Sequence, residues 1–391
     1  MLTAAGALPE VIRNRTFICR LPRGTGAGQL FSVWQLVQAS NEVAKFLSAP
    51  YNHNLNYAIG SQQLSMSGVS QDCAWVDGVN GTNSVSGEPL DQFVEIVDPG
   101  ACHLINLPDR IWVFGGACSR DGEASVSLRD SFWKQTLLPT AQQSWLAHLD
   151  RPENHNGWWA FSGYDDLLEF ERDACYLARA TILFAESPGS LAELGALAID
   201  ESILPRLHVV VQSRHLAENQ RESFLNLGPL KRVEKHGRRC VIGGDDGKEL
   251  PAVEFDVVTE SITSWLPTEP RSTALRIGNP THRLLLLADL VDLLLVSKIG
   301  DIQRAAAHFG ILLGESDVMR AMKLLDFLGL AKLEHRGAEP FAVRREASAA
   351  PWVNYTAKAG TARFDRSRFK IAAEEFIKGD QRRNSIFERR Q

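Results

Sequence analysis

The residues whose types and spacing best suggest chemistry lie in the segment 186–195, which reads Glu-Ser-Pro-Gly-Ser-Leu-Ala-Glu-Leu-Gly. Its second glutamate, Glu193, is expected in the first turn of a helix, where the helix dipole favours a carboxylate. Cleavage of a glycosidic bond passes through a transition state that resembles an oxocarbenium ion. A carboxylate can stabilise that charge, or attack the carbon to give a covalent intermediate. Glu193 is therefore the candidate catalytic residue for cleaving the N-glycosidic bond of a nucleotide-like molecule.

The turn that precedes this helix supplies candidate substrate-binding groups. Gly189 permits close approach of the backbone to a ligand. Ser187 and Ser190 offer hydroxyl groups, and Glu186 stands at the start of the turn. The amino end of the following helix presents free N–H groups to an anion such as a phosphate.

A structural role for Glu193 explains the same spacing. Ser190 followed three residues later by Glu193 is the pattern of a capping box, in which the two side chains bond to each other's backbone. Short motifs of this kind also arise by chance. From the residues alone, the catalytic and the capping interpretations are equally supported.

The elements around this segment predict an α/β domain. Short apolar runs that indicate strands alternate with helical patterns. Such alternation predicts a parallel sheet covered on both faces, with the ligand beyond the carboxyl ends of the strands. Gly115 and Gly116 end the first strand at this edge and are candidate approach positions, although a tight turn would also need them. The expected strands are 110–116, 180–184 and 207–211, and the expected helices are 127–146, 171–179 and 191–200.

Three further residues of this region have two interpretations each. Glu171 either points into the pocket from the helix before the second strand or is a solvated charge, which we favour. Arg129 either lies near the phosphates of a ligand or belongs to a solvated loop, which is again the simpler account. His208 interrupts an apolar strand and is expected to be a core histidine with its hydrogen bonds satisfied, and not a catalyst.

The C-terminal third has the pattern of a winged helix-turn-helix. Helices are expected at 282–298, 301–309 and 316–328, and two strands, 330–334 and 341–345, flank Arg336-Gly337 as in a hairpin. The last thirty-one residues contain nine Lys/Arg against five Asp/Glu. Basic side chains clustered on such a fold are typical of phosphate contacts, or else are merely solvated; the candidates are Arg320, Lys323, Arg336, Arg344 and Arg345.

Composition limits the possible classes of function. The 391 residues carry a net charge of only -5, so the whole chain is not an evident polyanion binder. The six cysteines form no C-x-x-C pair and have no zinc spacing, so we expect no metal and a reducing, cytoplasmic location. The longest apolar stretch, 284–296, is interrupted by Asp289 and Asp292. It therefore predicts a buried helix and no membrane span.

The run 181–196, Thr-Ile-Leu-Phe-Ala-Glu-Ser-Pro-Gly-Ser-Leu-Ala-Glu-Leu-Gly-Ala, closely resembles the central motif of retron-associated anti-phage effectors with a nucleoside-deoxyribosyltransferase-like domain. Further matches follow in the family's order at 114–116, 168–171, 223–229 and 382–387. The resemblance covers roughly residues 108–391, and the central run is its specific part. The first hundred residues have no recognised counterpart.

The resemblance implies a fold and a division of the chain. It implies an α/β, parallel-sheet nucleoside-deoxyribosyltransferase-like domain at 101–260. A C-terminal, mostly α winged helix-turn-helix domain with a basic tail would follow at 275–391. Residues 1–100 would then be an N-terminal region of unknown role.

The resemblance also implies an activity. Glu193 would be the nucleophile and Asn226 would support the edge of the pocket. NAD is the leading substrate, and no cofactor is implied. The family's loop carries acidic residues where this chain has Glu186 and Ser187, a difference that favours hydrolysis over transfer between bases.

The implied partners are a retron reverse transcriptase and its multicopy single-stranded DNA/RNA, which would hold a toxic effector inactive and can form a higher-order assembly with it. A different class of function also fits. Without the acidic loop residues, the chain could be a catalytically inactive nucleotide-sensing and DNA-binding module. A cytokinin-type phosphoribohydrolase ranks lower, because only Pro188, Gly189 and Glu193 match its loop.

Overall fold

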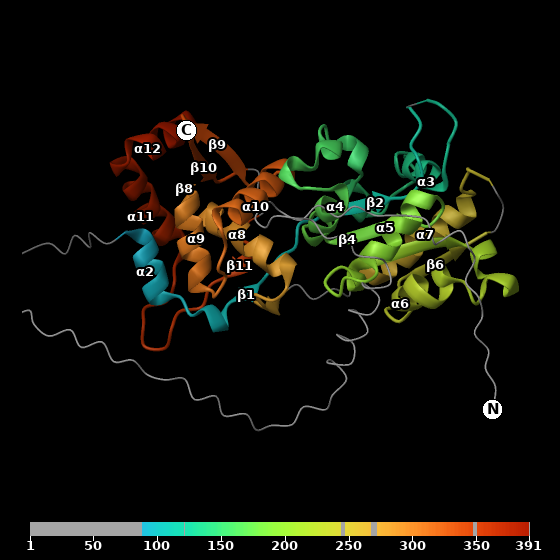
Figure 1. Ribbon diagram of the computed structural model, residues 1–391, viewed down its shortest axis with the longest axis horizontal. Coiled ribbons are helices and arrows are strands. Elements are labelled where there is room, and N and C mark those ends of the chain that lie inside the picture. Colours follow the sequence, from blue (N-terminus) through green and yellow to red (C-terminus); the bar gives the residue numbers. More distant parts are fainter. Residues whose placement is uncertain (1–87, 121, 244–246, 267–271, 347–349, 391) are drawn as a thin grey trace, which may run out of the picture. The chain divides into compact units, whose positions relative to one another are not determined.

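The computed structural model describes residues 88–120, 122–243, 247–266, 272–346 and 350–390 (Figure 1). The described residues all belong to the unit that spans residues 82–391. Most of the N-terminal region predicted at 1–100 therefore lies outside the described residues. Its last part does not, and forms helix α2, Pro89–Ile96.

A five-stranded parallel sheet forms the centre of the first half of this unit, which confirms the predicted α/β class. The strand order is β3-β2-β4-β5-β6, and every neighbouring pair is parallel. The three central strands are buried along their whole length, as the continuous apolar runs predicted. The strands are β2 (Ile111–Phe114), β3 (Leu149–Asp150), β4 (Ala180–Phe184), β5 (Leu207–Gln212) and β6 (Arg239–Ile242).

Helices cover both faces of this sheet, since alternate residues of one strand enter two different cores. Ile111 and Val113 of β2 belong to one core, while Trp112 and Phe114 belong to the other. Phe132 and Phe255 complete the first core from two of the helices. The helices are α3 (Leu128–Thr136), α4 (Leu167–Tyr176), α5 (Pro188–Leu197), α6 (Lys231–Glu234) and α7 (Ala252–Trp265).

All three helices predicted for the α/β half have different bounds in the structure, and the one expected at 191–200 spans Pro188–Leu197. The helix expected at 127–146 ends at Thr136, because Pro139 disfavours helical backbone in the residue before it. The helix expected from Glu171 begins at Leu167, because the side chain of Asp166 accepts a hydrogen bond from the backbone nitrogen of Glu169 and caps it.

The second half is mainly helical and contains the predicted hairpin. A helix, a strand and two further helices precede the hairpin: α8 (Pro280–Leu294), β8 (Val296–Lys298), α9 (Ile299–His308) and α10 (Glu315–Phe327). The hairpin consists of β9 (Lys332–Arg336) and β10 (Glu339–Val343), and β8 pairs with β10 on its other side. The predicted helix 282–298 was too long, because its last three residues form β8.

The remaining elements close around α8. They are the antiparallel strands β11 (Val353–Asn354), β1 (His103–Leu104) and β7 (Thr273–Ala274), and the helices α11 (Arg366–Gly379) and α12 (Gln381–Phe387). The two aspartates that interrupt the apolar stretch form ion pairs in this part of the structure. Asp289 is fully buried and pairs with Arg366 at 2.6 Å, and Asp292 pairs with Arg366 at 3.1 Å. Within the described part of the chain, none of the helices is long and apolar enough to cross a membrane.

Candidate functional site

The amino end of α5 is closed by two serines. The Ser187 hydroxyl accepts a hydrogen bond from the backbone nitrogen of Ser190 at 3.2 Å, and the Ser190 hydroxyl accepts one from the backbone nitrogen of Ser187 at 3.0 Å. Pro188 occupies the first helical position, where a missing N–H has no cost. Ser187 and Ser190 are therefore structural groups of the turn.

This cap corrects two expectations about Glu193. The capping box joins Ser187 to Ser190, so the alternative in which Glu193 completes a box from Ser190 is wrong. Glu193 is the sixth residue of α5 and lies in its second turn, because the helix begins at Pro188. The side chain is therefore left without the structural role that competed with the catalytic one.

The environment of Glu193 raises its pKa. Its Oε2 atom is buried and has no hydrogen-bond partner among the described residues. Burial, with further contributions from the nearby charges of Glu171 and Glu153, raises the pKa of Glu193 to about 7, and Arg129 opposes this shift. A carboxyl group with this pKa changes protonation state at neutral pH, as catalytic groups often do.

Glu171 lies beside Glu193 on the neighbouring helix α4. It is only 8% exposed, so its interpretation as a solvated charge is wrong. The indole Nε1 of Trp158 donates to its Oε1 at 3.1 Å. Burial raises the pKa of Glu171, and the hydrogen bond from Trp158 lowers it in part.

Arg129 brings a buried positive charge to the same group. Its side chain is 4% exposed, so the solvated loop expected for it is wrong. Its guanidinium pairs with Glu153 at 2.6 Å and donates to the carbonyl oxygen of Val113 at 3.2 Å. We call Glu153, Glu171, Glu193 and Arg129 the acid cluster. No sequence pattern singled out Glu153, which follows Pro152 in a short 3-10 turn.

Glu186 holds the loop after β4 to the start of α3. Its carboxylate accepts hydrogen bonds from the backbone nitrogens of Gly116 at 2.9 Å, Leu128 at 2.6 Å and Arg129 at 3.1 Å. Both oxygen atoms are thus used within the chain. The structure places Glu186 as a support for the sheet edge, and its predicted contact with substrate remains a prediction.

The two glycines after β2 are needed for the packing of the chain itself. A Cβ atom on Gly115, whose φ is +155°, would lie 2.9 Å from the Cβ of Arg129, and one on Gly116 would lie 2.6 Å from the Cβ of Ser127. Gly189, by contrast, is exposed, and a Cβ there would meet nothing closer than 3.9 Å. Gly189 is therefore the glycine that a ligand can approach.

Asn226 stabilises the loop that packs against α5. Its amide nitrogen donates to the carbonyl oxygens of His215 at 2.6 Å and Gln220 at 2.8 Å. The short π-helix Asn226–Leu230 contacts α5. Asn226 thus supports the neighbourhood of Glu193 indirectly. His208 is 1% exposed, and burial lowers its pKa to about 4, so its predicted place in the core is confirmed. Neither ring nitrogen has a hydrogen-bond partner among the described residues, so the expectation that its hydrogen bonds are satisfied is wrong.

The five basic candidates for nucleic-acid contact do not form one continuous free patch. Arg320 pairs with Glu169 of α4 at 3.4 Å, and Arg336 donates to the carbonyl oxygen of Ser385 at 2.9 Å. Arg344 pairs with Asp292 at 3.1 Å. Lys323 and Arg345 are exposed, so these two are the most accessible to a phosphate.

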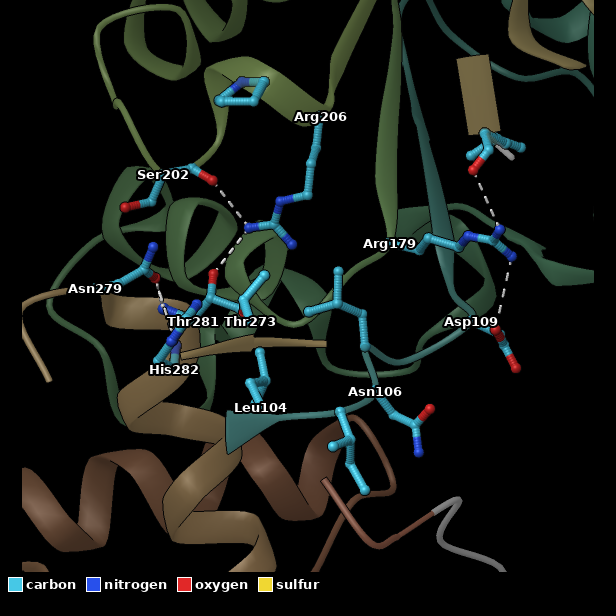
Figure 2. A pocket seen from close by; sticks show the side chains of 14 residues that line it. Leu104, Asn106, Asp109, Arg179, Ser202, Arg206, Thr273, Asn279, Thr281 and His282 are labelled. Atoms are coloured by element: carbon cyan, nitrogen blue, oxygen red, sulfur yellow. Dashed lines mark hydrogen bonds and ion pairs between the residues drawn. The ribbon is translucent and has the colours of Figure 1, made fainter. Parts of the chain in front are cut away.

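A hollow of about 450 Å³ lies at the opposite end of the sheet, where Arg179 precedes β4 and Arg206 precedes β5 (Figure 2). The guanidinium of Arg206 reaches into its wall and donates to the carbonyl oxygen of Ser202 at 3.0 Å and to the hydroxyl of Thr281 at 2.8 Å. Glu193 does not line this hollow. Ligands of open parallel sheets bind beyond the carboxyl ends of the strands, so we place the candidate active site at the acid cluster.

The described residues contain no group of three or more His, Cys, Asp or Glu side chains that could hold a metal ion.

The fold and the acid cluster define an α/β protein with buried carboxyl groups at the sheet edge, joined to a helical part that ends in a hairpin. The family model described as STM3845 retron effector protein matches residues 125–333, which is 209 of the 391 residues. The chain therefore belongs to this family of retron effectors.

Two relatives from Escherichia coli share shorter segments. A retron Ec86 protein, provisionally named a ribosyltransferase/DNA-binding protein, is 30% identical over 100 residues, which are 25% of this chain and 32% of the relative. A retron Ec73 protein with the corresponding name is 33% identical over 75 residues, 19% of this chain and 23% of the relative. The matched segments span less than a third of each relative.

Proposed function

We propose that this retron effector cleaves the N-glycosidic bond of NAD or a related nucleotide, with Glu193 as the nucleophile. The observation that carries the proposal is the buried Oε2 atom of Glu193, to which none of the described residues donates a hydrogen bond. Leaving a buried polar atom unsatisfied costs stability, and such a cost is typical of functional sites. The ribosyltransferase names of the two relatives agree with chemistry at a sugar carbon.

The proposed reaction has two steps. The ionised Glu193 attacks the anomeric carbon, the carbon–nitrogen bond breaks, and its electron pair leaves with the base, which for NAD is neutral nicotinamide. Water then attacks the same carbon and releases the carboxylate and the ribosyl product. The proton from water passes to a neighbouring carboxylate, for which Glu171 is the candidate because burial already raises its pKa.

The loop Glu186–Ser190 favours hydrolysis over transfer between bases. The one acidic residue of the Glu186–Ser190 loop, Glu186, accepts three backbone hydrogen bonds and is not available to protonate a base. Nicotinamide needs no such proton, because it leaves as a neutral molecule. The chemistry of the site therefore fits NAD better than an ordinary nucleoside.

The C-terminal half is proposed as a winged-helix-type domain that contacts the retron's nucleic acid. The order α8–β8–α9–α10–β9–β10, with β8 beside the hairpin, supports this assignment. We further propose, from membership of the family, that the reverse transcriptase and multicopy single-stranded DNA hold the effector inactive in the cytoplasm. The α/β half then corresponds to a nucleoside-deoxyribosyltransferase-like domain.

Nicotinamide release from NAD by the purified full-length chain, alone and with the reverse transcriptase complex, tests the proposal. We expect the free chain to release nicotinamide. In Glu193→Gln the rate of release should fall at least a thousandfold, since removal of a nucleophile has effects of this order. Glu201→Gln is the matched control, because Glu201 has a 79% exposed side chain just beyond α5. Equal rates in Glu193→Gln and the unsubstituted chain would remove Glu193 from the mechanism.

A nucleotide-sensing module without catalysis is the second candidate. The use of Glu186 within the chain favours it, because the loop then offers no free acid. This candidate predicts that NAD binds without any release of nicotinamide, even when the partner complex is absent. Turnover by the free chain excludes it.

A further inference from the structure

Trp158 connects the acid cluster to the aromatic core of the α/β half. Its side chain is fully buried at the start of the 3-10 turn Trp158–Gly163. The ring lies 4.9 Å from that of Trp112 and 4.8 Å from that of Phe170, measured between centroids, and both pairs meet edge to face. Both rings pack against the indole, whose N–H donates to Glu171.

The hydrogen bond from Trp158 stabilises the ionised form of Glu171, whose carboxyl group is buried beside Glu193. Among the described residues, the Trp158 indole is the only side chain that donates to the Glu171 carboxyl. A buried carboxylate needs such donors to remain ionised. Loss of this donor would therefore favour the protonated form of Glu171 and remove a negative charge from beside Glu193.

The same indole packs against α10 of the C-terminal half. Phe327, the last residue of α10, has its ring centroid 6.2 Å from that of Trp158 and 5.5 Å from that of Phe170. The carbonyl oxygen of the next residue, Leu328, accepts a hydrogen bond from Arg110 at 3.1 Å. The end of α10 is thus bound to the α/β half on two sides of Trp158.

We propose that Trp158 is a positioning residue that holds the Glu171 carboxyl beside Glu193, and that its own position depends on Phe327 of α10. This inference rests on the proposed role of Glu193. It makes α10 the element through which a partner of the C-terminal half would act, because displacement of Phe327 releases the indole that orients Glu171. The competing account is that Trp158 only fills the core, with its N–H bonded to the nearest acceptor.

The test compares Trp158→Phe, which keeps an aromatic ring but removes the N–H, with Phe327→Leu. The matched control is Trp145→Phe, since Trp145 is also buried and donates one hydrogen bond, to Thr263 at 2.9 Å, but belongs to the core on the other face of the sheet. Titration of the full chain labelled with ¹³C at the glutamate carboxyl carbons is followed by NMR. Glu171→Gln and Glu193→Gln assign the two signals.

In Trp158→Phe we expect the titration midpoint of Glu171 to rise by about one pH unit, the size expected for one hydrogen bond to a charged group. The midpoint of Glu193 should fall, because the negative charge of Glu171 beside it is then lost. Phe327→Leu should shift both midpoints in the same directions by less, and Trp145→Phe should leave both unchanged. Glu171→Gln should lower the Glu193 midpoint as well, which tests the coupling even if Trp158→Phe does not fold.

Unchanged midpoints in Trp158→Phe would overturn the inference, whatever the activity of the protein. Unchanged midpoints in Phe327→Leu alone would overturn the part played by α10. If the midpoints shift as expected but the free chain never releases nicotinamide from NAD, the proposed function fails and the positioning of Glu171 by Trp158 stands. The NMR titration thus tests the positioning of Glu171 independently of the proposed NAD cleavage.

Discussion

The carboxylate of Glu186 accepts a hydrogen bond from the backbone nitrogen of Leu128 at 2.6 Å, so the loop after β4 closes the amino end of α3. Two more backbone nitrogens, of Gly116 and Arg129, bond to the same carboxylate. One side chain therefore connects three segments that meet at the candidate active site.

Loss of this carboxylate should destabilise the fold. We expect Glu186→Ala to lower the free energy of unfolding by about 2–4 kcal/mol, because three partly buried N–H groups lose a charged acceptor. Urea unfolding measures the change. Glu201→Ala is the control and should cost less than about 0.5 kcal/mol, as is usual for exposed positions. A similarly small effect of Glu186→Ala would show that water replaces the carboxylate.

Glu193→Gln should stabilise the protein at alkaline pH. The folded pKa of about 7 lies above the ordinary value of 4.5, so the folded state binds this proton more tightly than the unfolded state. Its contribution to stability is therefore complete below pH 4.5 and is lost as the pH rises through 7. Glutamine does not titrate, so Glu193→Gln avoids this loss of stability. We expect a difference in the free energy of unfolding on the order of 1–3 kcal/mol at pH 8, after allowance for the partial exposure of Glu193.

Thermal unfolding of the two proteins at pH 4.5 and pH 8 measures this difference. The unfolding temperatures should be close at pH 4.5, and the variant should be the more stable at pH 8. An equal difference at both pH values would mean that Glu193 titrates normally.

The pH dependence of NAD cleavage should reveal the role of Glu193. A nucleophile acts in its ionised form, so kcat/KM should rise about tenfold per pH unit below pH 7 and level off above it, since the pKa of Glu193 is about 7. Nicotinamide release across pH 5–9 gives the profile. A rate that instead falls above pH 7 would assign Glu193 the role of a general acid.

Asp289 should be among the most important residues for the stability of the C-terminal half. It is fully buried and accepts hydrogen bonds from the backbone nitrogen of Trp352 at 2.7 Å and from Arg366 at 2.6 Å. Asp289→Ala removes one of the two buried carboxylates that pair with Arg366 and the acceptor of two backbone N–H groups, those of Trp352 and Val353, and should cost about 3–5 kcal/mol. Chemical unfolding measures the loss, and Glu375→Ala, in an exposed pair with Lys378, should cost well under 1 kcal/mol.

Nucleic-acid binding should depend unequally on the basic residues. Lys323 and Arg345 are exposed, so Lys323→Ala and Arg345→Ala should each weaken binding to single-stranded DNA and reduce the slope of log affinity against log salt by roughly 0.7. Arg336→Ala should leave the slope unchanged, because its guanidinium bonds to Ser385. Fluorescence anisotropy at several salt concentrations checks this, and equal slopes for all three variants would reject α10 and the hairpin as the binding surface.

Local sequence patterns predict the three central strands of the parallel sheet, the hairpin and the position of Glu193 just after the second of these strands. Continuous apolar runs and turn residues carry this information, because each central strand is buried on both faces. The edge strands β3 and β6 were not predicted, because they are short and only partly buried. The same local patterns did not fix the ends of helices. The extent of α5 depends on the serine cap, and the end of α8 depends on the pairing of β8 with β10.

The grouping of charges around Glu193 arises only when the chain folds. Glu153, Glu171 and Arg129 are distant from Glu193 in the sequence, and each is individually compatible with a solvated position. Burial and the close approach of α3, α4 and α5 bring them together, and the resulting desolvation and repulsion raise the pKa of Glu193. A pattern of residue types cannot encode that effect, because it arises from distances between segments that only folding sets.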